Sequence, residues 1–296
     1  LYFTIWTKFV QFRMLPEGIR LLKEKSHHDD GVSSFQALMI STASRVGTGN
    51  IAGVATAIAW GGPGALFWMW AIAFLGAGSA FAESTLGQLY KEQHEGQYRG
   101  GPAYYIEKGF GETWFAKAYG LLFAIVTVIA IGILLPGVQS NSIADAVKSS
   151  FGLSTTVTAV ILVVLTGIVV LGGIKRIGSA AEFIVPFMGG LYILMAVIII
   201  IVNIGQLPTV LAQIFKGAFR LDATFGGIFG STVAWGVKRG VYSNEAGQGT
   251  GPQASSAAEV NHPAVQGFVQ AFSVYVDTLF VCSATGFMIL MTNCYT

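Results

Sequence analysis

The sequence predicts an all-α, polytopic membrane protein. Hydrophobic residues make up 53% of the 296 residues and charged residues only 11%. A soluble domain usually carries about 25% charged residues, so this composition is that of a membrane protein. The apolar residues also gather in runs of about 20, the length with which an α-helix crosses the hydrocarbon core of a bilayer. The net charge of +2 gives no reason to expect a nucleic-acid partner.

The apolar runs divide most of the chain into candidate membrane spans. These are residues 35–60, 65–90, 114–145, 153–173, 182–203, 225–242 and 266–291. The residues up to about Val10 are expected to end an earlier span. Pro136 predicts a kink in the third span. Residues 204–224 predict a longer loop that contains a short helix from 209 to 219.

The basic residues favour one orientation of these spans. Lys and Arg gather in the linker 11–34 and then in every second connection, at 91–117, 175–176 and 238–239. Cytoplasmic loops are the ones that carry an excess of Lys and Arg. We therefore expect the linker to be cytoplasmic and each following span to reverse direction.

The first candidate span is interrupted near its middle by Gly47, Thr48, Gly49 and Asn50. Hydrocarbon offers no water to unpaired backbone groups, so a break at this depth persists only where protein buries it or a cavity uses it. Glycine alone could mark a tight helix contact, but the Asn50 amide needs partners in a dry setting. We interpret the break as the midplane site of a secondary transporter. N–H groups after the break would hold a carboxylate, while carbonyls before it and the Thr48 and Asn50 oxygens would hold a cation.

A second broken helix is expected where glycines punctuate the span 225–242. The residues of interest there are Phe229, Gly230, Thr232, Trp235 and Gly236. The same stretch could instead be a small-residue packing face, with Trp235 in an interfacial belt. Residues 243–249 are also polar and rich in glycine, and form the alternative position of the break. We favour 229–236, because Lys238 and Arg239 then lie at the cytoplasmic edge.

Several ionisable residues lie in or beside the apolar spans, where such residues are functional candidates. Asp277, followed by Thr278, is interpreted as a cation ligand in preference to a structural partner of Arg45. Arg45 could extend to the cytoplasmic interface, or it could form an inner gate with Glu83 or Glu245. Both alternatives for Arg45 remain open.

Gln139 follows the proline in the third span. Polar residues at the end of an apolar run often mark only a helix terminus. If the third span is long and tilted, however, Gln139 faces the cavity. The sequence favours neither alternative.

Two other classes of function find little support. No metalloprotease motif or phosphate-binding loop is present, so an enzyme is not expected. A channel would need a continuous polar pore, and the spans lack repeated polar stripes.

Taken together, the motifs resemble those of the alanine or glycine:cation symporter family. They are VGTGNIAGVA at 46–55, GGPGALFWMW at 61–70, GGPAYY at 100–105, RGVYSNEAG at 239–247, HP at 262–263 and DT at 277–278. These motifs occur in order and extend over roughly residues 35 to 290, which makes the match specific.

The resemblance implies a LeuT-like fold of two inverted five-helix repeats, with the first helix of each repeat broken at the substrate site. It implies Na⁺-driven uptake of alanine or glycine across the plasma (inner) membrane, with H⁺ as the alternative coupling ion and no organic cofactor. Carried over by motif, the substrate would contact Gly47, Thr48, Gly49 and Asn50. Gln139 and the stretch 229–236 would complete the pocket. From position and chemistry we add Asn50, Asp277 and Thr278 as sodium ligands.

The resemblance also divides the chain. Residues 1–34 would be the end of a preceding transmembrane helix and a linker, and 35–203 the first repeat. Residues 204–224 would be an extracellular loop, and 225–296 the first two helices of an incomplete second repeat. Because the sequence starts at Leu1 and stops after an apolar run, we expect a fragment that does not transport by itself.

Overall fold

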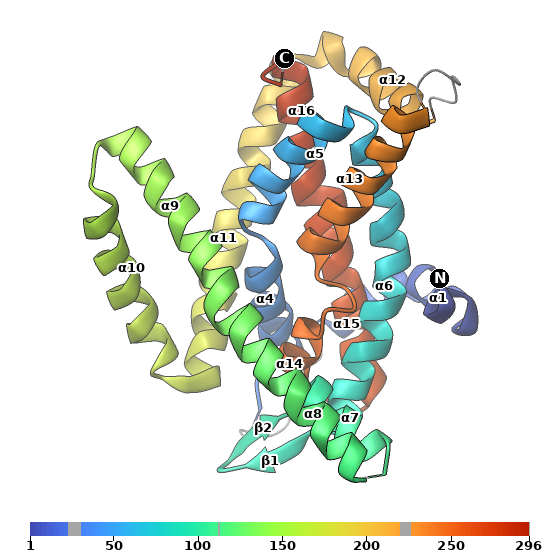
Figure 1. The fold of residues 1–296 in the computed structure, drawn as a ribbon, viewed down its shortest axis with the longest axis vertical. Coiled ribbons are helices and arrows are strands. Elements are labelled where there is room, and N and C mark those ends of the chain that lie inside the picture. The colour runs from blue at the N-terminus through green and yellow to red at the C-terminus, as the bar shows by residue number, and fades with distance from the viewer. Residues whose placement is uncertain (23–30, 112, 220–225, 296) are drawn as a thin grey trace.

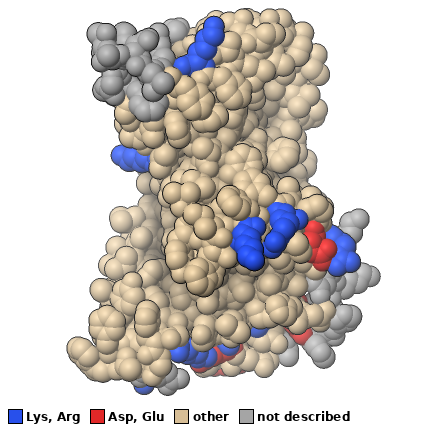
Figure 2. Space-filling view, turned by 90° about the vertical axis from the view of Figure 1, so that its right-hand side faces the viewer, with Lys and Arg blue, Asp and Glu red and all other residues tan. Residues whose placement is uncertain are grey.

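The computed structural model describes residues 1–22, 31–111, 113–219 and 226–295, without the side chains of 226–229. Four helices within these ranges are long and apolar enough to cross a membrane: Ala65–Leu89, Trp114–Phe151, Gly173–Val202 and Pro263–Thr292. Charged side chains occupy only small patches of the face in Figure 2. The predicted all-α membrane protein is therefore confirmed.

The elements follow one another along the chain as in Figure 1. The first part contains α1 (Tyr2–Trp6), α2 (Val10–Arg13), α3 (Leu15–Leu21), α4 (Ser34–Arg45), η1 (Gly49–Gly53), α5 (Val54–Gly61), α6 (Ala65–Leu89), β1 (Glu92–His94), β2 (Gln97–Arg99) and α7 (Pro102–Gly109). The middle part contains α8 (Trp114–Thr127), η2 (Val128–Leu134), α9 (Leu135–Phe151), α10 (Thr155–Val170) and α11 (Gly173–Val202). The last part contains η3 (Ile204–Gln206), α12 (Leu207–Ala218), α13 (Gly226–Asn244), α14 (Thr250–Ser256), α15 (Pro263–Tyr275), η5 (Val276–Cys282) and α16 (Ser283–Thr292).

The first broken helix has clear local signals at its ends. α4 begins with a capping box, in which the side chains of Ser33 and Gln36 each bond to the other residue's backbone N–H. α5 ends at Gly61 and is followed by Gly62, whose φ of 74° suits glycine after a helix C-terminus. Between them η1 is π-helical. Local sequence therefore fixes where this helix starts and ends.

The helix α13 runs antiparallel to η1 and α5, and Figure 1 shows α13 beside α5. Gly49 lies against Ser243 near the end of α13, whereas Gly61 lies against Thr232 nearer its start. As residue numbers rise in one helix they fall in the other.

The helices α6 and α15 form a second antiparallel pair. The Phe81 ring packs on Phe268, and the Phe74 ring packs on Tyr275. Small residues let the two helices approach closely, since a Cβ on Gly267 would meet the Phe81 backbone. These two pairs form the centre of the molecule.

The third candidate span is longer than expected. α8, η2 and α9 together form one helix of 38 residues that ends at Phe151. η2 is π-helical and lies directly before Pro136, so the helix is distorted where the proline predicts it. This long helix crosses the bundle obliquely in Figure 1.

Two boundaries differ from the expected ones. α11 begins at Gly173 and not at residue 182, so Lys175 and Arg176 lie in its first turns; neither residue type opposes a helix. The short helix expected at 209–219 is α12. Of the expected linker, residues 23–30 lie outside the described ranges.

The second break lies at 245–249 and not at the favoured 229–236. α13 is continuous, and the chain leaves the helix at Glu245, Gly247 and Gly249, with φ values of 52°, 85° and 88°. Gly236 and Gly240 serve close packing instead, since Gly236 lies against the backbone of Ala65 and Gly240 against Met69, both in α6, whereas Gly230 faces open space. The small-residue packing face was the correct alternative for this stretch.

Candidate functional site

Asn50 is the centre of the first break and is fully buried. Its Oδ1 accepts a hydrogen bond from the Gly47 N–H at 2.8 Å. Its Nδ2 donates to Asp277 Oδ1 at 2.6 Å and to Cys282 Sγ at 3.2 Å. The amide thus has the partners that a dry setting demands, and it joins the break to η5.

Asp277 is fully buried and accepts hydrogen bonds at both carboxylate oxygens. Oδ1 takes the Asn50 bond, while Oδ2 accepts from Ser243 Oγ at 2.9 Å and Thr278 Oγ1 at 2.8 Å. No ion pair among the described residues includes Asp277. Its hydrogen-bond donors are all neutral, and Arg45 attracts its charge without a direct contact, so a cation bound at the carboxylate could supply closer compensation.

Ser243 and Cys282 also lie at the contact between Asn50 and Asp277, although neither was among the predicted site residues. Ser243 lies in the last turn of α13, beside the second break, and its Oγ lies 3.1 Å from Cys282 Sγ. The signal for Ser243 was its place in the 243–249 alternative. Cys282 follows Asp277 by five residues, and the π-helical winding of η5 brings such residues toward one face. No sequence pattern indicated that winding.

Gln139 of the long third helix reaches the first break. Its Oε1 accepts from the Thr48 backbone N–H at 3.1 Å and from Thr48 Oγ1 at 2.7 Å. A Cβ on Gly47 would collide with Gln139 Nε2, so the approach requires glycine at 47. Gly49 is similarly close to the Tyr242 ring. The structure thus brings together Gln139 and all four residues of the first break.

The residues of α13 that were expected to line the substrate pocket lie away from the first break. Thr232 Oγ1 donates to the Gly61 carbonyl at 2.6 Å, and the Trp235 ring stacks on Trp60 with centroids 6.4 Å apart. Gly61 is about 16 Å along the helix from Asn50 at 1.5 Å per residue. Gly230 and Gly236 belong to the same part of α13, and the side chain of Phe229 lies outside the described side chains. The structure does not bring these residues to the first break.

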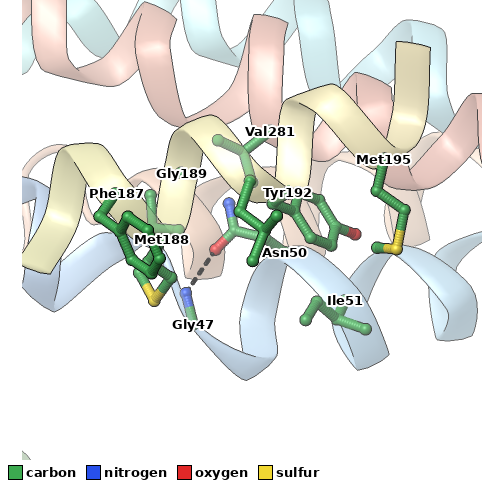
Figure 3. A pocket seen from close by; sticks show the side chains of 11 residues that line it. Gly47, Asn50, Ile51, Phe187, Met188, Gly189, Tyr192, Met195 and Val281 are labelled. Atoms are coloured by element: carbon green, nitrogen blue, oxygen red, sulfur yellow. Dashed lines mark hydrogen bonds between the residues drawn. The ribbon is translucent and has the colours of Figure 1, made fainter. Parts of the chain in front are cut away.

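A cavity of about 380 Å³ lies between the first broken helix and α11. Its lining residues are Val46, Gly47, Asn50, Ile51, Phe187, Met188, Gly189, Leu191, Tyr192, Met195 and Val281. In Figure 3 the Asn50 amide turns toward Gly47, and the α11 side chains lie alongside. Apart from Asn50 and Tyr192, the lining side chains are apolar.

A cluster of buried charged residues lies beside the two breaks. Glu83 accepts from the Gly247 N–H at 3.0 Å and from the Gly249 N–H at 3.2 Å, so its carboxylate holds the second break. Glu245 accepts from Ser44 Oγ at 3.0 Å and from Thr250 Oγ1 at 2.6 Å.

Arg45 is 3% exposed, so it does not extend to an interface. Its Nη1 donates to Gln270 Oε1 at 3.3 Å, and Nε and Nη2 have no hydrogen-bond partner within the described ranges. No described ion pair includes Arg45, although Glu245, Glu83 and Asp277 are all close enough to attract its charge. The three expected gating residues therefore lie together, with the carboxylates bonded to loop and hydroxyl groups.

Comparison with known proteins agrees with these motifs. The chain is 61% identical over 293 residues to the "putative sodium/proton-dependent alanine carrier protein YrbD" of Bacillus subtilis, covering 99% of this chain and 60% of that protein. It is 48% identical over 297 residues to the "probable sodium/glutamine symporter GlnT" of the same organism, covering 100% and 61%. It is 43% identical over 298 residues to the "sodium/alanine symporter AgcS" of Methanococcus maripaludis, covering 99% and 66%.

The chain thus spans 60% to 66% of the length of these three relatives. The sequence profile of the sodium:alanine symporter family matches residues 1–296. The expected resemblance is confirmed: the chain belongs to the sodium:alanine symporter family.

Proposed function

We propose that the protein is a secondary active transporter that carries alanine or glycine into the cell together with Na⁺. The observation that carries the proposal is the contact between Asn50 and Asp277, which joins a broken helix to a buried carboxylate. The names of YrbD and AgcS, which include sodium and alanine, support it. The protein would lie in the plasma membrane as a multi-pass protein.

The fold proposed for this activity is the LeuT-like inverted repeat, with residues 35–203 as the first repeat and 225–296 as the start of the second. Its support is the antiparallel packing of η1 and α5 with α13 and of α6 with α15. An inverted repeat predicts that corresponding helices run in opposite directions. The first helix of each proposed repeat is also interrupted, at 46–50 and 245–249.

The Na⁺ ion would bind at Asp277, with Thr278 and Asn50 as expected and Ser243 as an added ligand. Asp277 is the charged group of this set, and Na⁺ would supply the charge that its neutral donors lack. Its ligands come from η1, α13 and η5, so a bound ion would hold three helices together.

The substrate carboxylate would bind the N–H groups of Thr48 and Gly49, where the helix resumes and its dipole favours an anion. The neighbouring apolar cavity would take a small side chain such as the methyl group of alanine. In the alternating-access cycle, Na⁺ would first stabilise the outward-open form. Substrate binding would then allow the bundle to rock inward, with Arg45, Glu83 and Glu245 closing the inner side.

The main alternative is the same transporter driven by H⁺, which the name of YrbD also mentions. A channel or a membrane enzyme finds no supporting arrangement among the described residues.

The test is uptake of radiolabelled alanine into proteoliposomes that contain the protein over the full length of its relatives. Accumulation above equilibrium only with an inward Na⁺ gradient is the expected result. Accumulation driven by a proton gradient alone would select the H⁺-coupled alternative. Parallel assays with glycine and glutamine identify the substrate, and absence of accumulation under either gradient would overturn the proposal.

A further inference from the structure

The side chain of Gln139 occupies the Thr48 N–H, one of the two backbone donors that a carboxylate would use at the first break. One oxygen, Oε1, accepts both the backbone N–H and the hydroxyl of Thr48, at 3.1 and 2.7 Å. Thr48 is the residue before η1, and its own side chain caps no N–H of that helix. The donor at the start of the resumed helix is therefore satisfied from a different helix.

The bond between Gln139 and Thr48 is one that a ligand can replace. A carboxamide oxygen is neutral, whereas a carboxylate forms shorter and stronger bonds to the same N–H donors and is favoured by the helix dipole. A backbone N–H makes one good hydrogen bond, so the two acceptors exclude each other at Thr48. Gln139 is also only half-buried, in contrast to the fully buried Asn50 beside it.

We propose that Gln139 is an internal competitor of the substrate: its amide oxygen fills the carboxylate position in the empty site and leaves when an amino acid binds. This inference rests on the proposed function, because it assumes that the substrate carboxylate binds at Thr48. Gln139 thereby lowers the affinity for substrate and keeps the break satisfied while the site is empty. Gly47 is required for the same arrangement, because a Cβ there would exclude the Gln139 amide.

The test is equilibrium binding of radiolabelled alanine at saturating Na⁺ to the purified protein over the full length of its relatives. Gln139→Ala removes the competitor and should lower the Kd about three- to tenfold, as expected for the loss of one or two modest hydrogen bonds. Gln139→Glu adds a tethered carboxylate, which should raise the Kd about tenfold or more. Asn141→Ala, on the exposed side of the same helix, is the matched control and should leave the Kd unchanged.

A Kd that falls in Gln139→Ala and rises in Gln139→Glu distinguishes competition with the substrate from a general loss of binding. If Gln139 instead contacts the bound substrate, or merely supports the fold, the Kd rises in Gln139→Ala as well, and the inference is overturned. The Tm of each variant identifies a folding defect, and in that case Gln139→Met, which keeps the bulk without the acceptor, must give the lower Kd. Asn50→Ala distinguishes the two proposals. If Asn50→Ala abolishes alanine binding while Gln139→Ala weakens it, only the competitor is disproved; if Asn50→Ala has no effect, the proposed site itself fails.

Discussion

The two helix breaks at the centre of this protein differ in the groups that accept their free N–H donors. At the first break the acceptor for Thr48 is the neutral, half-buried amide of Gln139. At the second break the carboxylate of Glu83, only 7% exposed, accepts from both Gly247 and Gly249. Displacing a buried carboxylate from two N–H groups costs more than displacing a half-buried neutral amide from one. A ligand could therefore replace the acceptor at the first break more easily than the acceptor at the second, as the proposed substrate site requires.

This difference suggests how a ligand site can be told from a structural interruption. Both breaks contain two glycines and polar neighbours, so composition alone does not separate them. The two breaks differ instead in the charge and burial of the group that accepts their free backbone N–H donors. The comparison can be tested by removing each acceptor in turn.

The largest effect is expected for Glu83→Ala. The change leaves the N–H groups of Gly247 and Gly249 without their acceptor. The buried group at Gly249 costs about 1–3 kcal/mol and the exposed one at Gly247 less, so the free energy of unfolding should fall by about 1–4 kcal/mol. Gln139→Ala should lower it by only about 1 kcal/mol, because water can replace its half-buried amide. Thermal unfolding in detergent measures both. Glu95→Ala, in an exposed turn, is the control, and a Glu83→Ala protein as stable as that control would contradict the comparison.

The next effect is expected for Asn50→Ala. Asn50 bonds to Gly47 and to the Asp277 carboxylate, and a hydrogen bond to a charged group contributes about 1.5–3 kcal/mol. The initial rate of alanine uptake should therefore fall at least about tenfold. Asn141→Ala should transport normally. Near-normal uptake by Asn50→Ala would remove Asn50 from the site.

A smaller and more specific effect is expected for Asp277→Asn. The amide keeps the shape of the carboxylate and removes its charge, so the half-saturating Na⁺ concentration should rise severalfold. The dependence of uptake on Na⁺ concentration measures this. Asp145→Asn, on the outer part of α9, is the charge-matched control. If Na⁺ dependence does not change, the role of Asp277 is structural.

The smallest effect is expected for Trp235→Ala. Its ring stacks on the exposed Trp60 at the far end of α5, away from the first break. The half-saturating alanine concentration should stay within about twofold of the original value, the usual effect of a change outside a site. A tenfold rise would instead return α13 residues 229–236 to the pocket.

Part of this site could be predicted from the sequence. Asn50 was predictable because an amide in a dry helix needs partners, and Asp277 because an intramembrane acid is costly without a role. Both lie where these arguments place them, in contact with each other. Whether they bind substrate and sodium stays a prediction.

The second break was misplaced because glycine has two uses in membrane helices. Gly236 permits close packing against α6, whereas Gly247 and Gly249 adopt positive φ, and the sequence alone does not distinguish these uses. Ser243 and Cys282 were missed since their role depends on the π-helical winding of η5 and on how three helices meet. Such tertiary features have no signature in local sequence.

The position of Cys282 makes the site observable by thiol chemistry. Its sulfur is fully buried where η1, α13 and η5 meet, whereas the other cysteine of this sequence, Cys294, is exposed. A buried thiol is inert toward alkylating reagents until its surroundings open. With Cys294 replaced by serine, the alkylation rate of Cys282 would record how often these three helices separate, and an ion or substrate that holds them together would slow that reaction.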